Sequence, residues 1–356
     1  MLPELLLVPA AAATSWALTA AVRKYALARS VLDVPNQRSS HTVPTPRGGG
    51  MAIVVAFLAG VALAGLAGWV APWVSAALLG GGVLVAGIGL VDDHRSVSAR
   101  ARLAVHFLAA AWALYWLGGL PSLGVGSGTV QLGIAGTLLA ALGVVWFVNM
   151  YNFMDGIDGI AGSEAVTVGL AGGGLLLAAG SPGLATLSFL LAAAAAGFLV
   201  WNWQPARIFM GDVGSGFLGF CFAVLALASE RAGAVPLLAW VLLLGVFLFD
   251  ATLTLGRRVL QGERWYDAHR SHAYQRAVQH GWGAAAVTCG VIALNIVLGA
   301  LAWLAVVEPG WLPPALLAGV VVLGAAYLLV ERARPMYPTR EGVPGPKSER
   351  CSTPRS

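Results

Sequence analysis

Residues 149–164 read Asn149-Met-Tyr-Asn-Phe-Met-Asp-Gly-Ile-Asp-Gly-Ile-Ala-Gly-Ser-Glu164 and interrupt a sequence that is otherwise almost continuously apolar. The polar side chains of this stretch recur every three residues, at Asn149, Asn152, Asp155 and Asp158. Glycine costs about 1 kcal/mol per helical position relative to alanine, so Gly156 and Gly159 favour a helix end that opens into a tight polar loop. An ordinary glycine-rich turn is the alternative, but such turns rarely carry two asparagines and two aspartates together.

The composition around this stretch is that of a membrane protein. Of the 356 residues, 58% are hydrophobic and 10% are charged, whereas a soluble globular protein is about 25% charged. Apolar runs of roughly 17 to 25 residues recur throughout the chain, so a single secretory signal peptide does not explain them. The three cysteines suggest no disulfide framework. We therefore predict an all-α integral membrane protein.

The apolar runs predict 10 to 11 transmembrane helices in one catalytic domain over residues 1–330, followed by a polar tail over residues 331–356 that we expect to be disordered. Eleven runs are found, near 5–21, 50–68, 73–91, 103–117, 134–150, 165–180, 184–201, 214–228, 235–255, 284–306 and 314–330.

The charged residues predict which loops face the cytoplasm. If the N-terminus lies outside, only Arg231 of the 21 Lys and Arg residues faces outward, as the positive-inside rule requires. All eight aspartates then lie in cytoplasmic segments or near the inner end of a span. We therefore expect cytoplasmic catalytic loops, and we interpret the basic residues as topology signals and not as a nucleic-acid site.

Two further segments are suited to phosphate. The first polar segment contains Asp33-Val-Pro-Asn-Gln-Arg-Ser-Ser-His41 and then Pro44-Thr-Pro-Arg-Gly-Gly-Gly50. Its basic residues, including Arg47, could meet phosphate beside exposed backbone N–H groups at a helix start. A stiff proline turn with positive-inside charge is the alternative. Residues 256–283 form the most basic loop, and their His269-Arg-Ser-His272 is denser than an interfacial segment requires.

Four more aspartates lie near span ends. Asp92 and Asp93 are adjacent, and such carboxylates repel each other unless a cation or proton lies between them; a solvated loop start is the alternative. Asp212 is the only acid of Gly211-Asp-Val-Gly-Ser-Gly216, where little bulk would hinder a hydrated Mg²⁺ carrying phosphate, although close helix packing also uses glycine. Asp250 could support the site from behind its contacting residues or pair with Arg257 or Arg258, and we expect the ion pair.

In this order, the motifs resemble those of the polyprenyl-phosphate N-acetylhexosamine-1-phosphate transferase family, whose members start bacterial peptidoglycan, O-antigen and teichoic acid assembly. The resemblance runs from about Asp33 to Trp282 and rests on four ordered motifs. The last loop departs from the peptidoglycan translocase, in which three histidines are adjacent. It resembles the O-antigen-initiating branch more closely.

The resemblance implies transfer of a sugar 1-phosphate from a UDP-sugar to undecaprenyl phosphate at the cytoplasmic face of the bacterial inner membrane, with release of UMP. It implies Mg²⁺, or Mn²⁺ in its place, as cofactor, and leaves a homodimer open. Catalytic roles fall to Asp92, Asp93 and Asp212, of which Asp212 and Asp92 would hold the metal. Substrate-binding roles fall to Arg47, Asn149, Asn152, Asp155, Asp158, His269, Arg270 and His272.

Two other functions remain open from the sequence. A lipid-linked sugar flippase would need polar residues distributed through the membrane interior, whereas here they gather at one face. A CDP-alcohol phosphotransferase would carry an Asp-Gly-x-x-Ala-Arg motif, which Asp158-Gly-Ile-Ala-Gly162 does not match. The sequence does not name the sugar, for which GlcNAc, FucNAc and QuiNAc are candidates.

Overall fold

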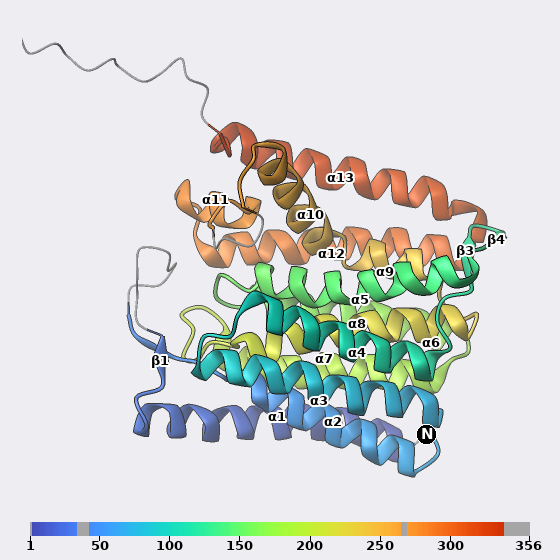
Figure 1. Cartoon of the computed structure of the whole chain (residues 1–356), viewed down its shortest axis with the longest axis horizontal. Coiled ribbons are helices and arrows are strands. Elements are labelled where there is room, and N and C mark those ends of the chain that lie inside the picture. Colours follow the sequence, from blue (N-terminus) through green and yellow to red (C-terminus); the bar gives the residue numbers. More distant parts are fainter. Residues whose placement is uncertain (1, 34–42, 265–268, 338–356) are drawn as a thin grey trace, which may run out of the picture.

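The computed structural model describes residues 2–33, 43–264 and 269–337. Long helices lie side by side in a bundle (Figure 1). Strands β3 (Ser122–Val125) and β4 (Gly128–Gln131) form a hairpin at one end of the bundle. Strand β1 (Leu32–Asp33) and helix α11 (Ala273–Gln279) lie at the opposite end. The two ends therefore present different sets of loops.

Most of the chain is helical, as the long apolar runs predict. The other helices are α1 (Leu2–Ala28), α2 (Gly50–Leu66), α3 (Pro72–His94), α4 (Ala99–Leu117), α5 (Gly133–Met154), α6 (Ile160–Ala178), α7 (Pro182–Asn202), α8 (Asp212–Arg231), α9 (Leu237–Leu243), α10 (Gly245–Leu260), α12 (Ala284–Val307) and α13 (Leu312–Ala333), with a 3-10 turn, η1, at Pro309–Trp311.

The predicted all-α membrane fold is confirmed. Among the described residues, eight helices are long and apolar enough to cross a membrane, and the bent pair α9 and α10 would make a ninth. All eleven predicted runs fall on helices, but the number of eleven spans and the orientation of the chain stay predictions. The run 235–255, predicted as one span, forms the two helices α9 and α10, which meet at an angle of 80°.

Two small antiparallel sheets were not predicted. In one, β1 pairs with β2 (Thr45–Pro46), with Leu32 opposite Pro46 and Asp33 opposite Thr45. In the other, β3 pairs with β4 over four residues each. Short strands of this kind leave no period-two hydrophobic signal in the sequence, because they are too short to show one.

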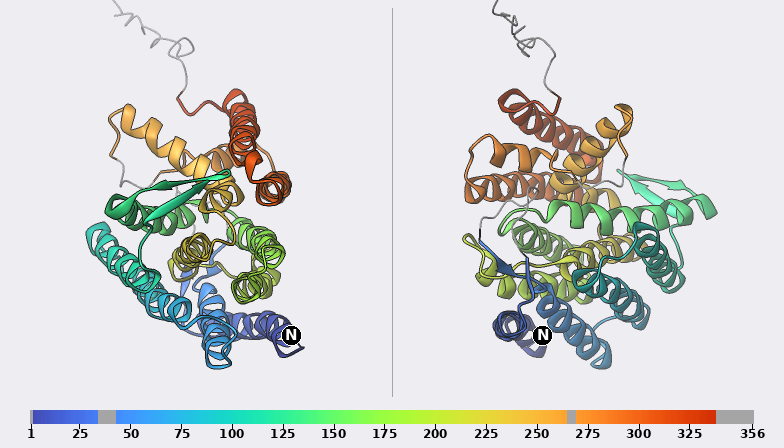
Figure 2. Two further views of the ribbon diagram at one scale, coloured as in Figure 1. Left: turned by 90° about the vertical axis from the view of Figure 1, so that its right-hand side faces the viewer. Right: turned by 60° about the vertical axis from the view of Figure 1, so that its left-hand side comes forward.

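Helix α8 lies in the middle of the bundle (Figure 2), and all of its residues from Val213 to Ser229 are buried. Helices α2 and α3 approach its first turn closely. A Cβ atom on Gly89 of α3 would lie 2.5 Å from the backbone oxygen of Asp212, and a Cβ on Gly50 of α2 would overlap the Cα of Gly214. Glycine at these two positions therefore lets three helices meet at the residue that begins α8.

The C-terminal end of α13 belongs to the folded bundle. Glu331 accepts hydrogen bonds from Arg257 of α10 at 2.7 Å and from Arg276 of α11 at 2.6 Å. The described structure continues to Tyr337, whose hydroxyl donates to Glu263 at 2.8 Å. The first residues of the predicted tail are therefore ordered against the bundle, and residues 338–356 lie outside the described part.

Candidate active site

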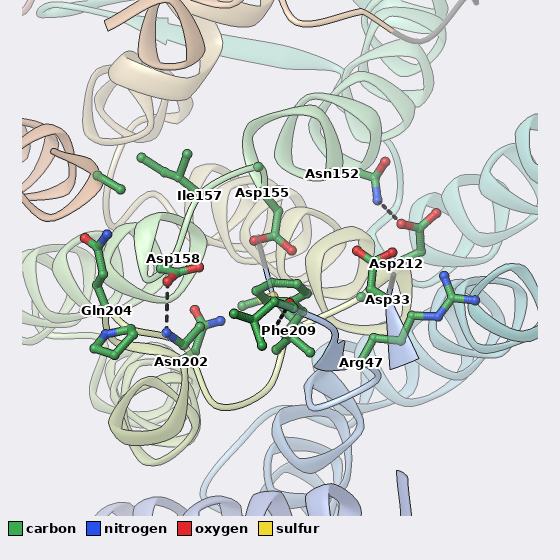
Figure 3. Close-up of a pocket in the computed structure, with 18 of the residues that line it drawn as sticks. Asp33, Arg47, Asn152, Asp155, Ile157, Asp158, Asn202, Gln204, Phe209 and Asp212 are labelled. Carbon is green, nitrogen blue, oxygen red and sulfur yellow. Dashed lines mark hydrogen bonds between the residues drawn. The ribbon is translucent and has the colours of Figure 1, made fainter. Parts of the chain in front are cut away.

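A cavity of about 580 Å³ opens at the end of the bundle that carries β1 and α11 (Figure 3). Six of the predicted site residues line it, which are Arg47, Asp93, Asn152, Asp155, Asp158 and Asp212. They come from the segment before α2, the end of α3, the end of α5, the loop after α5, and the start of α8. Motifs far apart in sequence therefore meet around one opening.

Asp212 is the first residue of α8, and its carboxylate contacts two side chains. Asn152 donates from Nδ2 to Oδ1 at 2.8 Å, and Arg102 donates from an Nη to Oδ2 at 3.2 Å. Asn152 also donates to the hydroxyl of Ser215 at 3.0 Å. The Asp212 side chain remains 34% exposed. Its carboxylate is therefore oriented from two sides while it stays accessible from the cavity.

Asp93 holds the start of α8. Its two carboxylate oxygens accept the backbone N–H groups of Asp212 and Val213 at 3.0 and 3.1 Å, and the residue is only 6% exposed. The first N–H groups of a helix have no partner within the helix, so a carboxylate there satisfies them and interacts favourably with the helix dipole. Asp93 thereby fixes the backbone that carries Asp212.

Gly211 makes this contact possible. Its φ of +77° lies in the left-handed region, and an added Cβ would lie 2.6 Å from Oδ2 of Asp93. A side chain at this position would therefore be strained and would also push Asp93 away from the helix start.

The adjacent residues Asp92 and Asp93 form hydrogen bonds with different partners. Asp92 accepts the backbone N–H of Val97 at 2.7 Å and an Nη of Arg102 at 2.6 Å. Asp92 does not line the cavity, and its side chain is 12% exposed. Their repulsion is therefore relieved by the helix start on one side and by Arg102 on the other. The predicted metal-binding role of Asp92 stays a prediction.

Arg102 was not among the predicted site residues. One Nη atom of Arg102 contacts both Asp92 and Asp212. The positive charge of this guanidinium therefore offsets the negative charge of two carboxylates at the N-terminus of α8. The only sequence signal was its membership of a basic loop, which the positive-inside rule already explains.

Asp155 and Asp158 add two carboxyl groups to the cavity lining, and Asp155 lies between Asp158 and Asp212 in the view of Figure 3. Burial, together with the charges of Asp212, Asp93 and Asp158, raises the pKa of Asp155 to about 7. Asp158 accepts the backbone N–H of Ala206 at 2.9 Å. Carboxylates that raise one another's pKa create a site that favours a cation.

The residues present fit a divalent cation. Asp212, Asp155 and the amide oxygen of Asn152 are hard oxygen donors around one cavity. Mg²⁺ usually takes one or two carboxylates and completes its shell with water and substrate phosphates. Within the described part of the chain, no group of three or more His, Cys, Asp or Glu residues is placed to hold a metal ion.

Further lining residues were not in the predicted set, and they come mainly from the loop between α7 and α8. They include Asn202, Gln204, Ala206, Phe209 and Gln275. Asn202 accepts the N–H of Gly159 at 3.0 Å and donates to the carbonyl of Ile208 at 3.0 Å. This amide therefore holds the aspartate loop against the α7–α8 loop.

Asn149 points elsewhere. Its Nδ2 donates to the carbonyl of Val145 in its own helix at 2.7 Å, and it faces a smaller pocket of about 30 Å³ with Arg102 and His106. The structure therefore does not bring Asn149 into the main cavity with Asn152.

His269, Arg270 and His272 also lie outside the described cavity lining. His272 is buried, and its ring lies 4.8 Å from that of His269. Burial and the nearby His272 and Arg258 lower the pKa of His269 to about 4, so this side chain is neutral at pH 7. The predicted contact of these residues with the donor stays a prediction, and the neighbouring residues 265–268 lie outside the described part.

Asp250 does not form the expected ion pair. Its carboxylate accepts the backbone N–H groups of Ala273 and Tyr274 at 2.8 and 3.2 Å, at the start of α11. Arg257 binds Glu331, and Arg258 binds Glu263. The expectation was wrong because helix α11 folds back onto α10 and offers unpaired N–H groups at closer range.

Comparison with known proteins finds a family model and several relatives that match this chain. The family model described as "Glycosyl transferase family 4" matches residues 75–230. A probable undecaprenyl-phosphate N-acetylglucosaminyl 1-phosphate transferase of Bacillus subtilis is 29% identical over 273 residues, 74% of each chain. A decaprenyl-phosphate N-acetylglucosaminephosphotransferase of Mycobacterium tuberculosis is 32% identical over 308 residues, 76% of this chain and 74% of the relative.

A relative with another described activity matches over a shorter region. A phospho-N-acetylmuramoyl-pentapeptide-transferase of Moorella thermoacetica is 37% identical over 171 residues, 44% of this chain and 54% of the relative. The matched family region contains the end of α3, the aspartate loop and the start of α8, which carry Asp93, Asp155, Asp158 and Asp212 of the cavity lining. The chain therefore belongs to glycosyl transferase family 4, the membrane family of polyprenyl-phosphate N-acetylhexosamine-1-phosphate transferases.

Proposed function

We propose that this protein transfers N-acetylglucosamine 1-phosphate from a UDP-sugar to undecaprenyl phosphate, with Mg²⁺ as cofactor and UMP as the second product. The product would be the first lipid-linked intermediate of a cell-surface polysaccharide such as O-antigen. The observation that carries the proposal is the convergence of Asp93, Asp155, Asp158 and Asp212 with Arg47 around one cavity at the end of a membrane helix bundle. The choice of sugar is supported by the N-acetylglucosamine transferases among the relatives.

The reaction brings two anions together, so charge must be neutralised before they can react. An oxygen of the lipid phosphate would attack the β-phosphorus of the donor, and the bond from that phosphorus to the oxygen of UMP would break. When bound, Mg²⁺ supplies charge neutralisation to the donor diphosphate. Asp212 is the residue best placed to hold it, because its carboxylate is oriented by Asn152 and open to the cavity.

Basic side chains provide the remaining positive charge. Nε of Arg47 is buried without a hydrogen-bond partner among the described residues, and Arg47 lines the same cavity as Asp212 (Figure 3). Arg102 sits between Asp92 and Asp212. The lipid phosphate monoester is already largely ionised at pH 7, since its second pKa is about 6. We infer that orientation and charge balance contribute more here than removal of a proton.

The cavity would face the cytoplasm in the bacterial inner membrane. The basic residues of the chain support this orientation, because the opposite one would place nearly all of them outside. Reporter fusions after Ser127 and at Arg264 test it: we expect an external signal from the first and a cytoplasmic signal from the second. A cytoplasmic signal from Ser127 would contradict the orientation.

The reaction itself can be tested with purified protein in proteoliposomes that contain undecaprenyl phosphate. A panel of UDP-sugars is added with Mg²⁺, with Mn²⁺ or with a chelator, and UMP is measured. We expect UMP and a labelled lipid from UDP-N-acetylglucosamine, loss of both with chelator, and no turnover by Asp212→Asn. Absence of UMP with every UDP-sugar would contradict the proposal.

A further inference from the structure

Glu164 closes the polar stretch that begins at Asn149, yet it takes no part in the cavity. It is fully buried in the first turns of α6. A carboxyl group in a membrane span is expensive to bury and commonly has a role. Among the described residues, no Lys or Arg forms a salt bridge with it. Its partner is an amide instead.

That partner lies on α12. Nδ2 of Asn295 donates to Oε2 of Glu164 at 2.6 Å and to the hydroxyl of Thr167 at 2.8 Å. Asn295 is 5% exposed and belongs to a buried stripe on α12. That stripe comprises Thr288, Val291, Asn295, Leu298, Ala302 and Ala305. Asn295 is therefore a polar group within the apolar face that α12 presents to the bundle.

A second hydrogen bond joins the same two segments nearer the cavity. The hydroxyl of Thr288, also fully buried, donates to the backbone carbonyl of Asp158 at 3.2 Å. We call the group of Asp158, Glu164, Thr167, Thr288 and Asn295 the α6–α12 seam. Thr288 and Asn295 are seven residues apart on α12, or roughly 10 Å along that helix. The seam thus runs from the edge of the cavity into the membrane interior.

The seam connects two walls of the cavity. Helix α6 continues from the loop that carries Asp155 and Asp158, and α12 begins with Ala284, which lines the cavity together with Gln275 and Val278 of α11. Asp155 and Asp158 therefore belong to one wall, and the α11–α12 segment belongs to the adjoining wall, which it meets at the Thr288–Asp158 hydrogen bond. The distance between these walls depends on how α12 packs against α6.

We propose that Glu164 and Asn295 are positioning residues that set this distance and thereby the affinity for the nucleotide-sugar donor. The pair acts through the seam and does not touch the reacting groups. Unsatisfied buried polar groups disfavour displacement of one helix along the other, since Asn295 would lose two acceptors at once. The proposal rests on the proposed transferase function, because it assigns the donor to the side of the cavity lined by Asp155 and Asp158.

The test compares kinetics of Glu164→Leu, Glu164→Gln and Asn295→Leu in proteoliposomes. We expect both leucine variants to raise the KM for UDP-N-acetylglucosamine by about tenfold, the order expected when one buried polar partner is removed. The KM for undecaprenyl phosphate should change by less than about twofold. Glu164→Gln should restore the donor KM to near the wild-type value, because it keeps an acceptor for Asn295. The double leucine variant should be no worse than Asn295→Leu alone, because Asn295→Leu already removes the bonds of Asn295 to both Glu164 and Thr167.

Ser188→Ala is the matched control. The Ser188 hydroxyl donates to the carbonyl of Gly169 at 2.8 Å, so its loss also removes a buried hydrogen bond to α6, but this bond joins α6 to α7 away from the cavity. We expect lower thermal stability with an unchanged donor KM. An equal rise in donor KM for Ser188→Ala and Glu164→Leu would overturn the proposal, as would a wild-type donor KM in Glu164→Leu.

Hydrogen–deuterium exchange provides a readout that does not need turnover. Amides of residues 155–161 and 284–288 should exchange faster in Glu164→Leu than in Ser188→Ala, and unchanged exchange would overturn the proposal. If Glu164→Leu does not fold, Thr288→Val removes the seam bond nearest the cavity and should give the same exchange and the same donor effect. Wild-type protein that is inactive with every UDP-sugar would refute the proposed function, while the exchange measurement would still decide the role of the seam.

Discussion

Replacement of Asp93 separates a positioning role from a direct catalytic one. Its two oxygens accept two backbone N–H groups at the start of α8, from Asp212 and Val213. Asp93→Asn keeps one acceptor oxygen and turns an NH₂ group toward the second N–H. Asp93→Ala removes both acceptors. The two substitutions therefore break one and two bonds at the same buried helix start.

The structure gives the size of the effect. A buried donor left without a partner costs about 1 to 3 kcal/mol, and loss of an N-terminal cap typically costs about 1 kcal/mol. We expect Asp93→Asn to lower the free energy of unfolding by about 1 to 3 kcal/mol and Asp93→Ala by about 2 to 5 kcal/mol. Because α8 begins with Asp212, a shift of about 1 Å in its start could lower kcat by roughly a hundredfold.

The assay combines thermal unfolding of purified protein with Mg²⁺ titration of transferase activity. Asp92→Asn is the control, since Asp92 binds Val97 and Arg102 and does not hold the start of α8. Asp93→Asn should lower both Tm and kcat and should require more Mg²⁺ than Asp92→Asn. If Asp93→Asn loses kcat while its Tm and Mg²⁺ requirement stay at wild-type values, Asp93 acts in the reaction and the positioning role is refuted.

Three further predictions concern charge and space around the cavity. The pKa of Asp155 is raised to about 7, so the folded state holds one more proton than the unfolded state between about pH 4 and pH 7, and stability falls as pH rises through that window. Without divalent cation, Asp155→Asn should therefore raise Tm much more at pH 8 than at pH 4.5. An equal gain in Tm at both pH values would contradict the raised pKa. Arg102→Leu should lower kcat but also lower the Mg²⁺ concentration needed for half-maximal activity, because Arg102 competes for Asp212; a higher Mg²⁺ requirement would argue against that competition. Gly211→Ala should abolish activity through its contact with Asp93, whereas Gly233→Ala, also at positive φ but with open space around it, should lower only Tm; equal activities of the two variants would show that the contact is unimportant.

The sequence predicts which motifs lie at one end of the bundle where those motifs follow or precede helices that end there. The stretch with Asp155 and Asp158 follows the apolar run of α5, and the glycine-rich stretch with Asp212 precedes the apolar run of α8. The asymmetry of the basic residues assigns both loops to the same side of the membrane. The convergence of Asp155, Asp158 and Asp212 on one cavity then follows from the number of spans between them.

What the sequence does not predict depends on contacts between distant helices. Asp93 and the N–H of Asp212 are 119 residues apart, and nothing in the pair Asp92-Asp93 indicates which of the two carboxylates holds a helix start. Arg102 is one basic residue among several in its loop. The break between α9 and α10 lies at Leu244, directly before Gly245, and no proline lies within residues 237–260. One glycine among 46 does not indicate in the sequence that a helix breaks there.

Asn295 illustrates the same limit inside the membrane. A single asparagine in a long apolar run can face lipid, a neighbouring helix or a polar partner, and the helical period alone does not distinguish these environments. Only the packing of α12 on α6 shows that it meets Glu164.

The fate of the β-phosphorus of the donor tests the central claim most directly. Donor UDP-N-acetylglucosamine labelled at the β-phosphorus is incubated with undecaprenyl phosphate, Mg²⁺ and the wild-type protein or Asp212→Asn, and label is measured in the lipid and nucleotide fractions. Transfer of the sugar 1-phosphate predicts label in the lipid, unlabelled UMP in equal amount, and neither with Asp212→Asn. Label that remains in released UDP while the sugar moves to the lipid, or lipid labelling by Asp212→Asn at the wild-type rate, would contradict the account.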